Sequence, residues 1–408
     1  MNSGSSQASR GHSTWRMVKL RHLVKRVRKP VKVKADQKYR EIGIFSHGKG
    51  LFYKEEKTGS SLGNKRVYWI EPDCFVANIV FAWEQAIAKT TNAERGMIAS
   101  HRFPMYKPIE GRLDLDYLVY FFKTPKGKYL LGLASPGGAG RNKTLGQQAF
   151  LDLEIPLPSF PEQRKIAAVL GTWDEAIALT ERRIEAAQQR KKGLMQRLLT
   201  GRVRFPGFEE EWRRASLGSI ATVNPPKPKN LPDDTLVSFI AMADVSEDAQ
   251  VINISERPYA EVSIGYTPFQ DNDVIVAKIT PCFENGKGAL VKGLKNGIGF
   301  GSTEFHVLRA NDTEILPEFL YYHMIAHDFR GRGESNMAGS AGQKRIRTDF
   351  VRTYKITLPP IEEQRRIVAV LQTCDQEIEL LQQKRDALQR QKKGLMQRLL
   401  TGRVQVEM

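Results

Sequence analysis

The chain carries one long segment twice. Residues 157–203, which begin LPSFPEQRKIAAVL and end KKGLMQRLLTGRV, return at 358–404 with a constant offset of 201 and no gap. Of the 47 aligned positions, 28 are identical, whereas the stretches that precede the two copies, 15–156 and 204–357, have diverged almost beyond recognition. A repeat of this kind favours two structural segments of one type that carry two separately specified domains.

The composition fits a chain with more than one domain. Its 408 residues exceed a typical single domain, and 41% hydrophobic residues suffice for real cores. The three cysteines, Cys74, Cys282 and Cys374, show no Cys-x-x-Cys spacing, so neither a disulfide framework nor a zinc site is expected. The cysteine pattern predicts a reducing, cytoplasmic location. Without a run of about 18 apolar residues, the sequence predicts no membrane span. Residues 1–14 are small and polar, and we expect them to be disordered.

The charge points to a polyanionic partner. The net charge is +18 and the sequence pI is about 9.7, which favours nucleic acid. Residues 16–40 hold eleven lysines and arginines against one acid, Asp36, with valines and leucines interleaved. Two interpretations of this basic segment are equally good: a stretch that tracks DNA phosphates, or the solvated face of a strand or short helix packed on a domain.

The repeated segments predict two long helices. Each begins at prolines, and Pro161 fits the first helical turn, where its missing N–H is not needed. Glu162 in one copy, and Glu362 with Glu363 in the other, place negative charge at the positive end of the helix dipole. Gly201 and Gly402 stand where left-handed C-terminal caps are expected.

Apolar residues recur at alternating spacings of three and four along both copies, which is a heptad seam. Because the chain is duplicated, an antiparallel helical pair with pseudo-twofold symmetry is the simplest arrangement. Ordinary helical packing without a spacer role is the alternative. Gly193 and Gly394 leave open a kink or a separate short helix that carries LMQRLLTGR. The residues expected to build this helical spacer are Ile166, Val169, Leu170, Trp173, Ile177, Leu194, Leu198, Ile367, Val370, Leu371, Ile378, Leu381, Leu395 and Leu399.

The two variable stretches predict mixed α/β (α+β) domains with a substantial sheet. Short β-like runs lie at 67–70, 74–81, 273–279 and 288–291, and probable helices lie at 115–122 and 317–326. Residues 98–103 and 300–305 echo one another weakly. A glycine-rich basic loop follows each helix, at 137–143 and at 339–347.

These features together resemble the specificity subunit of type I restriction-modification enzymes. Each variable domain starts at a Trp-x-x-x-x-Leu element, at Trp15 and Trp212, and each repeated helix opens with Pro-x-x-x-Glu-Gln-Arg, at 158–164 and 359–365, and closes on Leu-Leu-Thr-Gly. The duplicated Pro-x-x-x-Glu-Gln-Arg helix is the most specific part of the match, which spans the chain after residue 14. The very basic residues 16–40 depart from the usual pattern of the family.

The resemblance implies two target recognition domains, 15–156 and 204–357, each reading one half of a bipartite, asymmetric double-stranded DNA target. It implies that the helical spacers, 157–203 and 358–408, set the distance between the halves and dock two methyltransferase (M) subunits, with restriction (R) subunits in the full complex. S-adenosylmethionine, ATP and magnesium would then belong to the partner subunits, and this chain would hold no cofactor or metal.

Specific DNA recognition needs arginine, lysine, asparagine or glutamine at base edges, while phosphate contacts fix the register. The loops of both variable domains supply such residues, and solvated surface is the competing interpretation for each of them. The predicted DNA-binding residues are His101, Arg102, Arg141, Asn142 and Lys143 in the first domain, and Lys278, Gln343, Lys344, Arg345 and Arg347 in the second.

Three motifs that imitate catalytic sites do not change this interpretation. Asn224-Pro225-Pro226-Lys227 resembles the loop of adenine methyltransferases, but lysine replaces the aromatic ring that would stack on a flipped base. Residues 43–49 match the opening of a phosphate-binding loop, yet Gly50 stands where Ser or Thr should bind magnesium. His323 and His327 lack a third metal ligand. We therefore expect a non-catalytic subunit; a coiled-coil scaffold whose basic heads bind protein, or nucleic acid without sequence preference, is the alternative.

Overall fold

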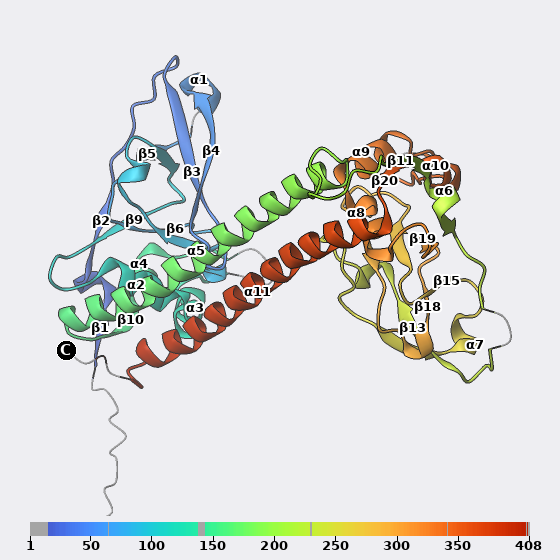
Figure 1. Ribbon diagram of the computed structural model, residues 1–408. Helices are drawn as coiled ribbons and strands as arrows, with labels where there is room; N and C mark the ends of the chain where they lie inside the picture. The colour runs from blue at the N-terminus through green and yellow to red at the C-terminus, as the bar shows by residue number, and fades with distance from the viewer. Residues whose placement is uncertain are drawn as a thin grey trace, which may run out of the picture. The chain divides into compact units, whose positions relative to one another are not determined.

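The computed structural model describes residues 15–63, 65–137, 143–228, 231–340, 342–404 and 406 (Figure 1). The chain divides into two compact units. Unit 1 takes in Met1–Glu181 and Gln383–Met408, and unit 2 takes in Arg182–Gln382. Each unit therefore combines one variable domain with part of both long helices. In the described residues no helix is both long and apolar enough to cross a lipid bilayer.

The variable part of unit 1 is a head closed by its own two ends. Strand β1 (Arg16–Lys19) pairs antiparallel with β10 (Glu154–Leu157), so residues 16–157 form the first head. Two four-stranded sheets follow, in the orders β2-β9-β6-β7 and β4-β3-β8-β5. Their strands are β2 (Val24–Val27), β3 (Lys38–Ile44), β4 (Leu51–Thr58), β5 (Val67–Trp69), β6 (Phe75–Ala77), β7 (Ile87–Lys89), β8 (Ile98–Ser100) and β9 (Met105–Pro108). The helices are α1 (Gly59–Leu62), α2 (Leu115–Lys123), α3 (Pro125–Leu133) and α4 (Gln147–Asp152), with 3-10 turns η1 (Leu20–His22), η2 (Ala82–Glu84) and η3 (Asn92–Glu94).

The variable part of unit 2 repeats this topology strand for strand. Strands β11 (Arg213–Ser216) and β20 (Lys355–Leu358) close the second head, residues 213–358. Its sheets have the orders β12-β19-β16-β17 and β14-β13-β18-β15. The strands are β12 (Ala221–Val223), β13 (Leu236–Ile240), β14 (Ser255–Pro258), β15 (Thr267–Gln270), β16 (Val274–Ala277), β17 (Gly288–Leu290), β18 (Ile298–Gly301) and β19 (Phe305–Ala310). The helices are α6 (Leu217–Ile220), α7 (Tyr259–Val262), α8 (Pro317–Ile325), α9 (His327–Ser335) and α10 (Thr348–Thr353), with η4 (Met242–Asp244) and η5 (Lys295–Gly297).

The pairing senses of the strands agree as well. In the first head β3 pairs parallel with β8, and in the second head β13 pairs parallel with β18; the remaining pairs within these sheets are antiparallel in both heads. The expectation of mixed α/β heads is thus confirmed. The sequence echo of 98–103 and 300–305 marks equivalent places, since these segments contain β8 and β18.

The predicted strand at 74–81 was too long, because the chain turns after Ala77: the Phe81 N–H donates to the Asn78 carbonyl oxygen at 3.0 Å. The basic segment, residues 16–40, belongs to the first head. It supplies β1, the short turn η1 and β2, and it enters β3 at Lys38.

The two repeated segments form the long helices α5 (Phe160–Leu198) and α11 (Ile361–Leu399), of 39 residues each. At a rise of 1.5 Å per residue, each is about 58 Å long. Pro161 lies in the first turn of α5, as predicted, and Gly201 and Gly402 adopt left-handed φ angles of 69° and 68° after the helix ends. Gly193 and Gly394 lie inside continuous helix, so neither glycine separates a short helix from α5 or α11.

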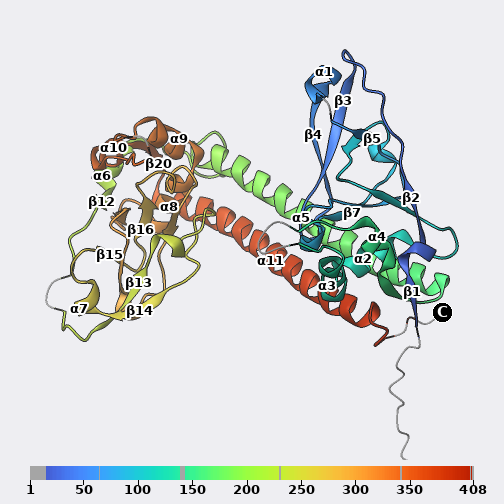
Figure 2. The ribbon, with the colours of Figure 1, turned by 180° about the vertical axis from the view of Figure 1, so that it is seen from behind.

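Within each unit the helices run antiparallel (Figures 1 and 2). In unit 1, Ile166 near the start of α5 shares a hydrophobic core with Leu399 at the end of α11. In unit 2, Leu198 at the end of α5 shares a core with Ile367 near the start of α11. The predicted antiparallel pairing is therefore confirmed within both units.

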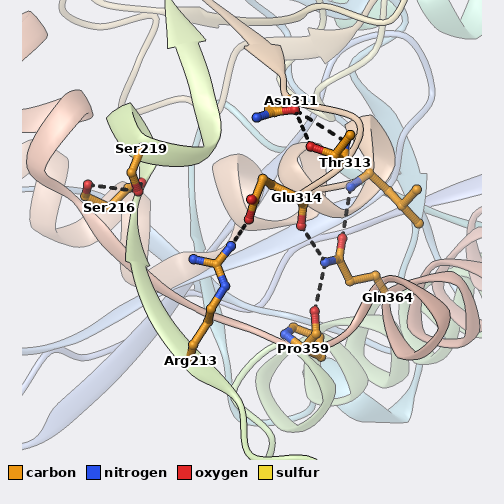
Figure 3. Close-up of polar contacts among 9 residues, drawn as sticks. Arg213, Ser216, Ser219, Asn311, Thr313, Glu314, Pro359 and Gln364 are labelled. Atoms are coloured by element: carbon orange, nitrogen blue, oxygen red, sulfur yellow. Dashed lines mark hydrogen bonds and ion pairs between the residues drawn. The ribbon is translucent and has the colours of Figure 1, made fainter.

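A buried glutamine at the start of each long helix holds the head in place. The side chain of Gln364 is fully buried; its Oε1 accepts from the Leu316 N–H at 2.9 Å, and its Nε2 donates to the carbonyl oxygens of Glu314 (3.0 Å) and Pro359 (2.9 Å) (Figure 3). Gln364 thus ties the loop before α8 to the residues before α11. Figure 3 also shows Arg213 of β11 paired with the Glu314 carboxylate.

Gln163 does the same in unit 1. Its Oε1 accepts from the Asp114 N–H at 2.8 Å, and its Nε2 donates to the carbonyl oxygens of Arg112 (3.1 Å) and Pro158 (3.0 Å). An amide side chain offers both an acceptor and two donors, which this set of backbone groups requires. The glutamine of the repeated Pro-x-x-x-Glu-Gln-Arg motif therefore joins the head to the helix through hydrogen bonds.

The glutamate of the same motif acts in unit 2. Glu363 is fully buried and accepts from Arg204 at 3.1 and 2.8 Å and from the Trp212 indole N–H at 2.8 Å. The tryptophan that opens the second variable domain is thereby tied to α11.

We expect Gln364→Ala to lower the free energy of unfolding of unit 2 by about 3 kcal/mol, because it leaves one backbone N–H and two carbonyl groups without partners at a buried site. The matched control is Gln397→Ala, at an exposed glutamine near the other end of α11. Urea unfolding followed by circular dichroism measures both. Equal stability of the two variants would contradict the fastening role.

Candidate nucleic-acid interface

Three segments of the second head meet at one backbone junction. The Lys278 N–H, just after β16, donates to the Glu304 carbonyl oxygen at 2.8 Å, and the Lys278 carbonyl oxygen accepts from the Ile346 N–H at 2.9 Å. These segments are the start of the β16–β17 loop, the turn before β19 and the end of the glycine-rich loop. The junction therefore gathers residues that are far apart in the sequence.

The first head contains the same junction with different residues. The Ile79 N–H donates to the Arg102 carbonyl oxygen at 2.9 Å, and the Ile79 carbonyl oxygen accepts from the Leu145 N–H at 2.8 Å. Arg102 and Leu145 thus correspond to Glu304 and Ile346. The backbone frame is shared by the two heads, while the side chains that it presents differ.

Most of the predicted DNA-binding residues of the second head lie at or beside this junction. Arg345 donates from Nε and Nη2 to the Glu304 carboxylate at 2.8 to 3.1 Å, and these hydrogen bonds hold the pKa of Glu304 below its usual range. The Thr280 N–H donates to the Lys344 carbonyl oxygen at 3.0 Å, which fixes the loop beside Lys278. Gln343 and Lys344 are exposed, and Arg347 is the exposed residue that precedes α10.

In the first head, His101 and Arg102 are exposed in the turn before β9. Lys143 ends the glycine-rich loop, with its Nζ 5.4 Å from the centre of the Trp83 ring. The prediction missed Trp83, because nothing in its local sequence shows that the β6–β7 loop meets the glycine-rich loop. Arg141 and Asn142 lie outside the described residues.

Asn224, of the motif that imitates a methyltransferase loop, has a structural role here. Its Oδ1 accepts from the Val307 N–H at 3.0 Å, and its Nδ2 lies 3.2 Å from Nδ1 of His306. Asn224 adopts a left-handed φ of 54° and fastens the end of β12 to β19. His323 is likewise an interior residue, and burial lowers the pKa of its imidazole to about 3. Among the described residues no cluster of three or more metal-binding side chains occurs.

A tyrosine, an aspartate and a lysine join the head to both helices in each unit. In unit 1 the Tyr120 hydroxyl of α2 donates to Asp174 of α5 at 2.6 Å, and Lys392 of α11 pairs with the same carboxylate and lies 5.1 Å from the centre of the Tyr120 ring. Burial acts against the charged form of Asp174, but the hydrogen bonds from Lys392 and Tyr120 keep its pKa below the usual range.

Unit 2 repeats this arrangement with the helices exchanged. The Tyr322 hydroxyl of α8 donates to Asp375 of α11 at 2.7 Å, and Lys191 of α5 pairs with that carboxylate beside the Tyr322 ring. Lys191 and Lys392 interrupt the apolar seam in the sequence. Their aspartate partners lie on the opposite helix and could not be identified from spacing.

The seam residues predicted to build the helical spacer fall into two groups. Six are buried in the cores that join head to helix: Ile166, Leu170, Leu198, Ile367, Leu371 and Leu399. The others are partly buried: Val169, Trp173, Ile177, Leu194, Val370, Ile378, Leu381 and Leu395. Two leucines outside the predicted seam are strongly exposed at equivalent positions, Leu179 (51%) and Leu380 (65%).

Comparison with known proteins identifies the family. The family model described as the type I restriction modification DNA specificity domain matches residues 13–189 and again 209–390. The chain belongs to this family. The two matches correspond to the two halves of the duplication, each with a head and most of the helix that follows it.

Relatives of this DNA specificity family include the type I restriction enzyme EcoEI specificity subunit of Escherichia coli. It is 41% identical over 172 residues, which is 41% of this chain and 29% of that relative. The MjaX specificity subunit of Methanocaldococcus jannaschii is 24% identical, over 74% of this chain and 71% of the relative. The chain thus spans less than a third of the first relative. A solved chain of a type I R-M system shares the fold, with a TM-score of 0.58, 19% identity, and coverage of 96% of this chain and 98% of that one.

We expect Lys392→Met to loosen the end of α11 by about 1–2 kcal/mol, because it leaves the half-buried Asp174 without its cation. The matched control is Lys393→Met at the neighbouring exposed lysine. Amide hydrogen exchange over residues 383–399 measures the effect. Equal exchange in the two variants would show that Lys392 does not hold the helical pair.

Proposed function

We propose that this member of the DNA specificity family is the sequence-recognition subunit of a type I restriction-modification system. It binds a bipartite, asymmetric double-stranded DNA target, and each head reads one half. The observation that carries this proposal is the shared backbone junction with different side chains: Ile79, Arg102 and Leu145 in one head, and Lys278, Glu304 and Ile346 in the other.

The chemistry of base recognition explains why such an arrangement suits two different half-sites. Sequence is read by side-chain donors and acceptors at base edges, while backbone frame and phosphate contacts fix the register. A head with Arg102, Lys143 and Trp83 at the junction presents donors and an aromatic ring. A head with Arg345 paired to Glu304 presents a different pattern of charge. One frame can therefore carry two specificities.

The proposal includes partners, because the chain itself is proposed to be non-catalytic. Leu179 and Leu380 are exposed at equivalent positions of the two repeated helices, so the chain presents the same apolar feature twice. A repeated feature suits two copies of one partner, here two methyltransferase (M) subunits, with restriction (R) subunits in the full complex. S-adenosylmethionine, ATP and magnesium are then supplied at sites of those subunits, and the complex acts in the cytoplasm.

The test is to express the chain with the cognate M subunit and to map methylated bases across the host genome by single-molecule sequencing. We expect a split motif, with two short defined blocks around a gap of fixed length. A partner that binds and methylates without any split motif would favour a scaffold that binds nucleic acid without sequence preference.

The proposed docking of M subunits at Leu179 and Leu380 is tested in the same experiment by substituting both leucines. Leu179→Asp with Leu380→Asp should abolish methylation while DNA binding by the chain is retained, and Leu179→Met with Leu380→Met, which keeps the apolar surface, should methylate normally. Normal methylation by the aspartate variant would exclude these leucines from docking and leave the recognition function intact.

A further inference from the structure

The two heads share a topology but differ strongly in charge. The first head, residues 16–157, contains 26 lysines and arginines against 13 acids, whereas the second head, residues 213–358, contains 17 of each. Most of the net charge of +18 therefore belongs to the first head. Affinity for DNA phosphates rises with the number of basic contacts. The two heads are therefore expected to contribute unequally to the electrostatic part of DNA binding.

Part of the surplus charge surrounds a small cavity in the first head. The cavity has a volume of about 190 Å³, and the residues that line it include Arg26, Arg28, Arg66, Tyr68 and His101. Arg26 belongs to β2, Arg28 follows that strand, and Arg66 directly precedes β5. Residues from separate parts of the sequence thus place three arginines around one cavity.

The guanidinium groups remain available to a ligand. Arg28 is held by Tyr68: its Nη2 donates to the hydroxyl oxygen at 2.8 Å, and its guanidinium carbon lies 5.3 Å from the ring centre. In the described part of the chain, none of the three arginines pairs with a carboxylate, unlike Arg345 of the second head, which is neutralised by Glu304. All three are exposed. This leaves unneutralised positive charge in a preformed cavity.

The second head does not repeat this chemistry. The strand pairings show which residues of the two heads are equivalent. Tyr106 and Leu308 are equivalent, because each stands four residues after its junction residue, Arg102 or Glu304. Arg26 pairs with Tyr106, and Val223 pairs with Leu308. Val223 therefore takes the place of Arg26, and Pro225 that of Arg28. The same counting along β5 and β15 puts Gly265 and Thr267 at the positions of Arg66 and Tyr68.

We propose that the Arg26–Arg28–Arg66 cavity binds phosphates of the DNA backbone and that the first head thereby supplies most of the electrostatic affinity of the chain. This inference rests on the proposed DNA-recognition function. The planar guanidinium fork matches phosphate oxygens in geometry and charge. Gln147 also lines the cavity with an amide whose Oε1 has no partner among the described residues.

The test uses the full chain with Arg26→Gln, Arg28→Gln and Arg66→Gln together, and a random-sequence DNA duplex as probe. Affinity is measured by fluorescence anisotropy between about 50 and 200 mM salt. Loss of about two phosphate contacts should reduce the slope of log affinity against log salt by about 1.8 and weaken binding about tenfold or more at the low-salt end. The single variant Arg66→Gln, whose side chain makes no hydrogen bond or ion pair in the described structure, should give a smaller change in the same direction.

The matched control removes the same charge from the second head, with Arg214→Gln, Arg352→Gln and Lys355→Gln at three exposed positions. We expect it to change the slope much less. Equal slopes for the two triple variants would overturn the cavity proposal, even when the chain still directs methylation to a split motif. If the cavity variant weakens DNA binding more than its control does, the cavity proposal is upheld. That result is independent of genome mapping, which tests sequence recognition separately.

Discussion

The rest of the structure depends on one set of hydrogen bonds that occurs in both units. A buried glutamine at the start of each long helix makes these bonds with the loop that enters α2 or α8. Gln163 and Gln364 each satisfy one backbone N–H and two carbonyl groups that would otherwise be buried without partners. Tyrosine, aspartate and lysine then join that same head helix to both α5 and α11. Because both sets of contacts lie in the repeated helices and the head helix beside them, the rest of each head is free to change.

That freedom is what a recognition subunit needs. The heads keep their strand order and their junction hydrogen bonds, while the side chains at the junction change from arginine to glutamate and from isoleucine to lysine. A change of target then needs new side chains on an unchanged backbone. The difference in charge between the heads fits the same division, in which phosphate attraction and base discrimination need not be shared equally by the two halves.

The helices could be predicted from the sequence because their signals are local. Pro161 and Gly201 mark the start and end of α5, the heptad spacing marks its apolar face, and the duplication implies antiparallel pairing. The glycine-rich basic loops were also recognisable from the sequence, and the structure places the end of each loop at or beside the junction. These predictions needed no knowledge of which strands pair.

What the sequence could not show depends on long-range pairing. The pairings of β5 with β8 and of β2 with β9 join strands that are far apart in the sequence. They bring Arg66 and Tyr68 close to His101 and Arg26. The aspartate partners of Lys191 and Lys392 lie on the opposite helix, about 200 residues away in the chain. Leu170 and Leu371 fit the apolar seam by spacing, but the heads cover them. Periodicity identifies an apolar face without identifying what packs on it.

We propose that the two heads are interchangeable recognition modules on a repeated frame. The most direct measurement replaces residues 213–358 with a second copy of residues 16–157, expresses this chain with its M subunit, and maps the methylated bases across the genome. The account predicts a target built from two copies of the half that the first head reads. A chain that assembles and methylates but keeps its original second half would contradict it.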